Sequence, residues 1–276
     1  MQNNSLTKTV KILAFGDVVG ELGCATFQKH AGKLKKQFKA DFIIVNGENS
    51  CNTGRGISPK LVAFFKHNGA DLVTSGNHIW GSKDIVEYLE NHNNDVLRPA
   101  NFPSQCPGKG LALLEKDGFT LAVMNLQGRV FMRELLDCPF KAADSMLTYI
   151  KSKTNLILID FHAETSSEKM GFAHYLDGRV TAVVGTHTHV QTADERVLPN
   201  GTAFITDLGM CGALNGMLGM RKEIIIRHLI TQMPQKFIVD NCPPAVISGV
   251  CITADVQTGL AINIERFRVI DNEITL

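Results

Sequence analysis

The sequence lacks the features that mark several protein classes. No apolar run approaches the roughly 20 residues that a membrane-spanning helix needs. The stretch from Val10 to Gly16 is too short for the apolar part of a secretion signal. The seven cysteines are scattered and contain no Cys-x-x-Cys pair, which argues against a disulfide framework or a zinc ribbon. We therefore expect a cytoplasmic protein with no membrane partner.

Strong charge, repeats and linkers are absent as well. The 28 basic and 27 acidic residues leave a net charge of +1, so nothing steers the protein toward nucleic acid over long distances. A chain of 276 residues is long enough for one large α/β domain or two small ones. Because no linker, repeat or low-complexity run divides it, we expect a single domain spanning residues 1–276.

Three apolar segments in the first third of the chain predict buried strands, each followed by a polar cluster. The segments are 10–16, 41–45 and 71–75, and helices are predicted at about 25–38 and 58–68. Glycines 20 and 23 are expected to mark a turn before the first helix. Alternating strands and helices are typical of a parallel sheet, which gathers ligands at the carboxyl ends of its strands.

The rest of the chain predicts more strands than one sheet holds comfortably. Hairpins are expected at 111–126, around Asp117-Gly118, and at 245–270. Further strands are expected at 155–161, 180–184 and 202–206, and helices at 140–151, after Thr165 in a capping box with Glu168, and at 222–232. The glycine-rich segment 209–219 is either a mobile pocket wall or a long loop. We predict an α/β fold, a four-layer α-β-β-α sandwich with two mixed sheets.

Side chains of the kinds that can bind metals stand at the ends of five predicted strands. In extended backbone His187 and His189 would point the same way, about 6.5–7 Å apart, and could reach two ions about 3.5–4 Å apart. Taken singly, each candidate has an ordinary explanation, such as a turn residue or a core histidine. Together, oxygen and imidazole donors without cysteine suit iron, manganese, magnesium or zinc, and their number suggests two ions sharing a bridging carboxylate. The candidates are Asp17, Glu48, Asn49, Asn77, His78, His162, His187 and His189.

The order of these residues resembles the calcineurin-like metallophosphoesterases. The segments 16–20 (GDVVG), 46–49 (NGEN), 76–78 (GNH), 125–129 (NLQGR), 160–164 (DFHAE) and 185–194 (GTHTHVQTAD) resemble the YmdB-like bacterial branch. The likeness runs from about Val10 to Ile270. The wider family has a histidine two residues after Asp17 and an aspartate-based motif where Gly47-Glu48-Asn49 stands. The YmdB-like branch shares both departures.

The resemblance implies a dinuclear site and a hydrolytic reaction. One ion would be held by Asp17, Glu48, Asn49 and His189, and the other by Glu48, Asn77, His162 and His187. Iron or manganese is expected, with magnesium or zinc as alternatives. The two ions would present a bridging hydroxide to phosphorus, and His78 would protonate the leaving oxygen as general acid. The substrates implied are phosphodiesters such as 2′,3′-cyclic nucleotides.

Several alternatives remain open at this point. Glu164 is either a hydrogen-bond partner of a ligand histidine or a solvated carboxylate, and Arg129 is either a phosphate ligand or a surface residue. The protein could instead be a metal-dependent regulatory or RNA-binding protein with a structural or sensory site. A dinuclear iron redox protein is less favoured, because the motifs hold no tyrosine or cysteine. RNA ends as substrates and a homo-oligomeric assembly also stay open.

Overall fold

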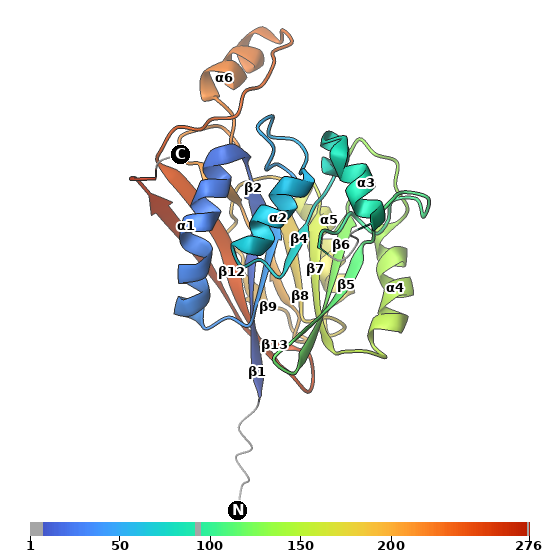
Figure 1. Cartoon of the computed structure of the whole chain (residues 1–276). Helices are drawn as coiled ribbons and strands as arrows, with labels where there is room; N and C mark the ends of the chain where they lie inside the picture. The colour runs from blue at the N-terminus through green and yellow to red at the C-terminus, as the bar shows by residue number, and fades with distance from the viewer. Residues whose placement is uncertain (1–7, 92–94, 275) are drawn as a thin grey trace, which may run out of the picture.

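A computed structural model describes residues 8–91, 95–274 and 276. Within this part of the chain the strands form a seven-stranded and a six-stranded sheet (Figure 1). The first sheet has the order β2-β11-β12-β1-β3-β4, with β13 on the other edge of β12. Its strands are β1 (Thr9–Phe15), β2 (Asp17–Val18), β3 (Phe42–Asn46), β4 (Leu72–Thr74), β11 (Met210–Ala213), β12 (Ala245–Asp255) and β13 (Ala261–Asp271).

The second sheet has the order β5-β6-β7-β8-β10-β9. Its four inner strands are parallel, and its two edge strands run antiparallel. Both sheets are therefore mixed, as predicted. The strands are β5 (Leu111–Lys116), β6 (Phe119–Gln127), β7 (Leu156–His162), β8 (Ala182–Thr186), β9 (Arg196–Val197) and β10 (Ala203–Ile205).

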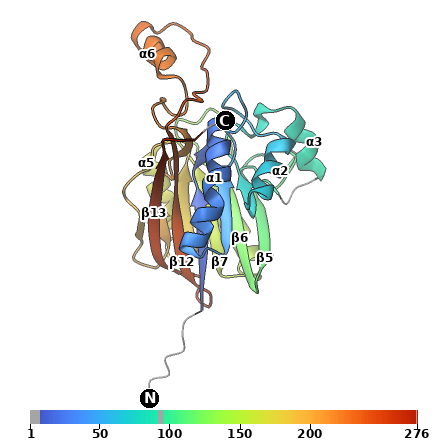
Figure 2. The same ribbon diagram turned by 60° about the vertical axis from the view of Figure 1, so that its left-hand side comes forward.

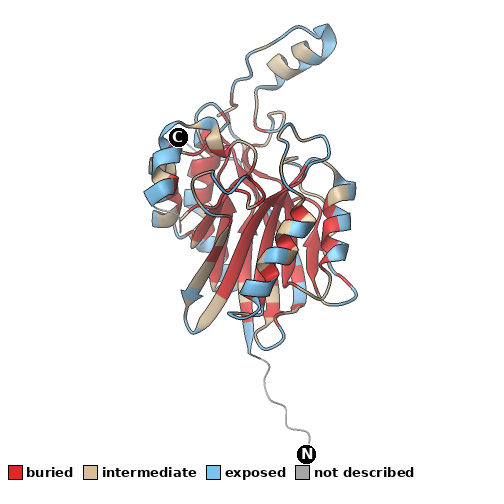
Figure 3. Ribbon diagram, turned by 90° about the vertical axis from the view of Figure 1, so that its right-hand side faces the viewer, coloured by how far each residue is buried: buried red, intermediate tan, exposed pale blue. Residues whose placement is uncertain are grey.

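Helices cover the outer face of each sheet and complete four layers (Figures 1 and 2). Strand β1 is covered on both faces by this arrangement. Leu13 and Phe15 pack under the helices, whereas Ile12 and Ala14 pack between the sheets. Successive side chains of a strand face opposite ways, so a strand buried on both faces has an unbroken apolar run. Figure 3 shows the strands as the buried centre of the molecule. The helices are α1 (Gly20–Phe38), α2 (Pro59–His67), α3 (Asp84–Asn91), α4 (Pro139–Ile150), α5 (Ser166–Tyr175), α6 (Lys222–Thr231) and the 3₁₀ helix η1 (Ile79–Gly81).

Most predicted elements are confirmed, but the predicted start of the first helix is wrong. The first helix begins at Gly20 and not near Ala25, because Gly23 lies inside it and packs closely against strand β11. A Cβ on Gly23 would lie 2.3 Å from the carbonyl oxygen of Cys211. For the segment 209–219 the long-loop alternative is wrong, since the segment contains β11, whose four residues are all buried. Two later residues of the segment, Met217 and Leu218, line a cavity.

The helix α6 stands apart from the four layers. None of its residues is buried, and in Figures 1 and 2 it projects beyond the ends of the sheets. No helix in the described ranges is long and apolar enough to cross a membrane.

Candidate metal centre

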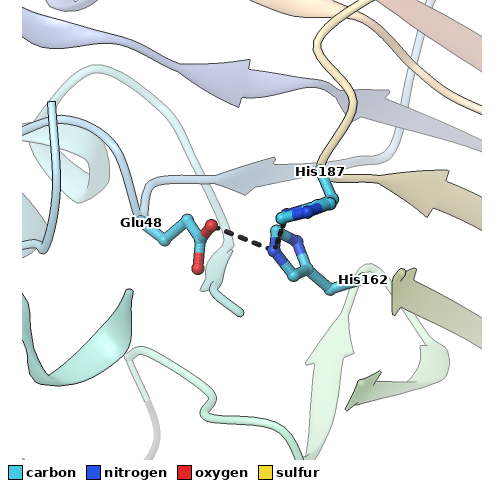
Figure 4. Close-up of side chains that lie close together, drawn as sticks. All are labelled: Glu48, His162 and His187. Carbon is cyan, nitrogen blue, oxygen red and sulfur yellow. Dashed lines mark hydrogen bonds and ion pairs between the residues drawn. The ribbon is translucent and has the colours of Figure 1, made fainter. Parts of the chain in front are cut away.

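The start of β2, the end of β7 and the loops after β3, β4 and β8 bring the predicted residues together at one end of the two sheets. Asp17, Glu48, Asn49, Asn77 and His78 come from the first sheet. His162, His187 and His189 come from the second. Glu48, His162 and His187 each offer a ligand atom, and these atoms all lie within 4.8 Å of one another (Figure 4). The site thus lies where the two sheets meet.

His162 is the centre of the first group of donors. Its Nε2 lies 3.0 Å from Glu48 Oε1, 2.9 Å from Asn77 Oδ1 and 3.0 Å from His187 Nδ1. Gly76 makes room for this ring, because a Cβ there would lie 2.2 Å from His162 Cδ2. One ring nitrogen carries at most one proton and cannot satisfy three neighbours.

A chain of hydrogen bonds fixes which nitrogen of His162 carries the proton. The hydroxyl of Thr186 donates to Asp160 Oδ1 at 2.7 Å, so its lone pairs face His162 Nδ1 at 2.9 Å. Asp160 also accepts hydrogen bonds from Asn46 and Thr74. Nδ1 must therefore be the donor, and Nε2 presents a lone pair toward the Glu48 carboxylate. Two acceptors 3.0 Å apart need a proton or a cation between them, and this geometry fits a metal ion.

A second set of unsatisfied acceptors lies beside the first. The Oδ1 atoms of Asp17 and Asn49 are buried and have no hydrogen-bond partner among the described residues. His189 Nε2 lies 3.8 Å from Asp17 Oδ1. The other ring nitrogen of His189 is 3.0 Å from the carbonyl oxygen of Leu218, which holds the proton on Nδ1 and leaves Nε2 a lone pair. Unpaired buried acceptors of this kind are costly without a cation.

Burial shifts the pKa values of the ionisable side chains in this group. Desolvation raises the pKa of Asp17 well above its usual value, and the nearby Glu48 carboxylate raises it further. Burial likewise raises the pKa of Glu48. It lowers the pKa values of His162 and His189, and that of His187 to about 3. The three imidazoles are therefore neutral at pH 7, the form of histidine that can bind a metal. A bound cation would favour both carboxylates in their ionised form.

The backbone of the His187-Thr188-His189 loop differs from the prediction. Strand β8 ends at Thr186, and His187 and His189 adopt φ values of 99° and 63°. The expectation that extended backbone places them side by side is wrong. Positive φ is unfavourable for side-chain-bearing residues, so the tertiary structure must hold this loop.

The buried carboxylate of Asp207 holds the loop in place. Its Oδ2 accepts hydrogen bonds from the Thr188 amide at 3.1 Å and the Thr188 hydroxyl at 2.8 Å. Lys169 Nζ, which is 1% exposed, pairs with the same oxygen at 2.7 Å. The amide of His187 donates to Asp17 Oδ2 at 3.2 Å. These contacts fix the backbone from which the imidazoles of His187 and His189 project.

His78 lies beside the two groups of donors. Its backbone amide donates to Glu48 Oε2 at 3.0 Å, and its side chain lines a cavity of about 410 Å³ with Glu48, Asn49, His187 and His189. Arg55 also lines this cavity. Glu164 is 47% exposed, and its Oε2 lies 2.9 Å from His187 Nε2. Arg129 is exposed and does not line this cavity.

Sequence reasoning missed Arg55 and the supporting residues Asp160, Thr186 and Asp207. Asp160 had a signal, because it precedes His162 by two residues in a strand and so shares its face. Arg55 and Asp207 had none, since their place depends on how distant segments pack.

The fold and the site together define a metallophosphoesterase, a class of hydrolase. A family model described as YmdB-like protein matches residues 13–267, so the chain belongs to the YmdB-like family. Both the predicted family and the predicted fold are confirmed.

Relatives match over almost their full lengths. A 2′,3′-cyclic-nucleotide 2′-phosphodiesterase of Bacillus subtilis (strain 168) is 46% identical over 265 residues, covering 96% of this chain and 99% of the relative. A putative phosphatase/phosphodiesterase of Mycoplasma pneumoniae is 34% identical over 274 residues, covering 97% and 96%. The crystal structure of a novel phosphatase from Mycoplasma pneumoniae is similar with a TM-score of 0.89 and 35% identity, covering 97% and 95%. That of a hypothetical protein from Thermus thermophilus has a TM-score of 0.87 and 36% identity, covering 95% and 100%.

Proposed function

We propose that this protein is a dinuclear metal-dependent phosphodiesterase that hydrolyses small phosphodiesters, 2′,3′-cyclic nucleotides in particular. The observation that carries the proposal is the pair of unsatisfied acceptor groups, one around His162 Nε2 and one at Asp17 Oδ1 and Asn49 Oδ1. Glu48 lies in the first group and lines the same cavity as Asn49. The Bacillus subtilis relative, with its named activity, supports the choice of substrate.

The ligand assignment follows the two groups. We propose that Asp17, Glu48, Asn49 and His189 hold one ion, and that Glu48, Asn77, His162 and His187 hold the other. Oxygen and imidazole donors suit iron or manganese, and also magnesium or zinc. When bound, two such ions make hydroxide available near neutral pH and neutralise charge on the phosphoryl oxygens.

Side chains of the cavity would protonate the departing oxygen and bind the phosphate. Hydrolysis breaks a P–O bond, and the departing oxygen needs a proton, for which His78 is the proposed general acid. Burial lowers the pKa of His78, whereas the Glu48 carboxylate raises it. A phosphate anion in the cavity would add to the effect of Glu48 and favour the imidazolium. Arg55 is placed to bind the phosphate through its guanidinium.

Turnover of 2′,3′-cyclic AMP by the manganese-loaded protein tests the proposal. We expect ring opening to a nucleoside monophosphate, and loss of turnover on chelation. A metal-loaded protein that binds RNA saturably but hydrolyses neither 2′,3′-cyclic AMP nor a chromogenic phosphodiester would instead be a regulatory or RNA-binding protein.

A further inference from the structure

The cavity at the metal centre has two chemically different sides. One side consists of Glu48, Asn49, Gly54, Arg55, His78, His187 and His189. The other side is apolar and comes from a single segment, residues 214–240, which we call the arm. The arm side chains that line the cavity are Met217, Leu218, Met220, Ile225, Leu229 and Phe237. No charged or hydrogen-bonding side chain of the arm, all of whose residues the structure describes, lines the cavity, so this side has nothing to offer a metal ion or a phosphate.

The base of the arm is fixed to the metal centre. The Leu218 carbonyl oxygen bonds to His189 Nδ1, and Met220 packs so closely on Gly54 that a Cβ there would lie 2.4 Å from the methionine methyl. Two backbone hydrogen bonds, Arg221 to Ile238 and Asp240 to Gly219, join the two sides of the arm. These contacts therefore fix the position of the apolar side of the cavity relative to the candidate ligand His189.

The helix α6 of the arm presents two apolar faces, and only one lines the cavity. Ile225 and Leu229 are four residues apart and share the face toward the cavity. Ile226 and Ile230 share another face and do not line the cavity. Both faces keep solvent exposure, since Ile226, Leu229 and Ile230 are 43%, 58% and 76% exposed. Because no residue of α6 is buried in the core, packing of the fold does not require Ile225 and Leu229 to be apolar.

Among the described residues that line this cavity, Phe237 is the only phenylalanine, tyrosine or tryptophan. The ring of His228 packs edge-on against it, with centroids 5.7 Å apart and planes at 71°. His228 is itself bonded to the carbonyl oxygen of Met233 at 2.8 Å. The His228 contact restricts the Phe237 ring on one side, and 37% of Phe237 stays exposed. Such a restriction lowers the entropy cost of stacking a planar group on the ring.

We propose that the arm is the nucleobase-binding wall of the active site, with Phe237 and Leu229 as specificity-determining residues. The inference rests on the proposed function, because a phosphodiester held by the candidate ligands must direct its remaining atoms into the same cavity. The volume of about 410 Å³ lies within the range of ligand pockets. A base stacks on aromatic and apolar side chains whatever its hydrogen-bonding edge. The wall lacks polar side chains that could recognise the hydrogen-bonding edge of a base. It therefore favours substrates that carry a base and accepts different bases.

Two substrates with the same reacting group test this proposal. One is 2′,3′-cyclic AMP, and the other is the 2′,3′-cyclic phosphate of methyl riboside, which has no base. Wild-type protein should hydrolyse both, with a lower KM for the nucleotide. Phe237→Ala and Leu229→Ala should each raise the KM for 2′,3′-cyclic AMP roughly tenfold, with kcat and the KM for the riboside unchanged.

Binding and a matched variant complete the test. In calorimetric titration, Phe237→Ala should weaken binding of the product adenosine 3′-monophosphate but not of methyl riboside 3-monophosphate. Ile230→Ala removes the same kind of side chain from the other face of α6 and should change nothing. Equal KM values for the two substrates in wild-type protein, or variants that affect both equally, would overturn the base-binding wall. Hydrolysis of neither substrate by wild-type protein would instead overturn the proposed function.

Discussion

His78 is the one residue of the centre with a predicted role in the chemistry and none in holding metal. We expect His78→Ala to lower kcat for 2′,3′-cyclic AMP by roughly 10²–10⁴-fold while metal content, measured by elemental analysis, stays unchanged. The loss should be smaller for a p-nitrophenyl phosphodiester, because that leaving group departs without a proton. The exposed His67 at the end of α2 provides the control, since His67→Ala should retain full activity. An equal loss for both substrates would remove the general-acid role from His78.

Glu48 is predicted to bridge the two ions, so its removal should affect both. We expect Glu48→Ala to lose most of its bound metal, measured by elemental analysis after gel filtration. The metal-free variant should stay folded, because burial already raises the pKa of Glu48 and makes its ionised form unfavourable there. Glu115→Ala, at an exposed position of β5, is the control and should keep its metal. Retention of two ions by Glu48→Ala would contradict the bridging role.

Most residues of the candidate site could be predicted from the sequence. Each proposed ligand follows an apolar strand, and parallel strands align their ends, so Glu48, His162 and His187 could be expected together. The Thr186 hydroxyl that orients His162 could not, because a threonine in a buried strand is ordinary. Arg55 reaches the cavity through a loop whose path depends on packing against the arm.

Among the elements, the strained loop after β8 depends on a buried ion pair beneath it. In Asp207→Asn the ammonium of Lys169, 1% exposed, would stay buried without its counter-charge. We expect a loss of about 3–5 kcal/mol in the free energy of unfolding, measured by urea denaturation. The double variant Asp207→Asn/Lys169→Met should recover part of this loss.

An exposed ion pair provides the comparison for that prediction. Asp144 and Arg179 are 2.6 Å apart but each about 40% exposed, so Asp144→Asn should cost about 1 kcal/mol or less. If Asp207→Asn were no more destabilising than Asp144→Asn, the ion pair would not be what holds the loop.

The elements differ in how far the sequence predicts them. Long apolar runs such as those of β3 and β7 predict strands, because both faces of these strands are buried. The Asp117-Gly118 turn predicts the β5–β6 hairpin, and both residues have the positive φ that such turns require. Strand β2 has two residues and pairs with β11, which is far away in the sequence, so no local pattern predicts it. Strand β9 also has two residues, too few to show an alternating pattern, and pairs with the nearby β10. The backbone of His187 and His189 depends on Asp207, which is far from them in sequence, and no local pattern encodes it.

For the whole molecule, the metal centre joins the two sheets at one end. Asp17 and Glu48 follow strands of the first sheet, and His162 and His187 come from the second. Without metal, this junction contains two buried carboxylates with raised pKa values and two imidazoles with lowered pKa values. Metal that binds only the folded protein should therefore stabilise the whole fold.

We expect chelation with EDTA to lower Tm and re-addition of manganese to restore it. The stabilisation should rise with free metal, by about 2.7 kcal/mol at a hundred times Kd and about 4.1 kcal/mol at a thousand times Kd. Differential scanning calorimetry at several free manganese concentrations measures this slope. Glu48→Ala is the control, because a protein that cannot hold the ions should melt at a Tm independent of manganese. If wild type and Glu48→Ala responded equally, the stabilising ion would lie outside the junction between the sheets.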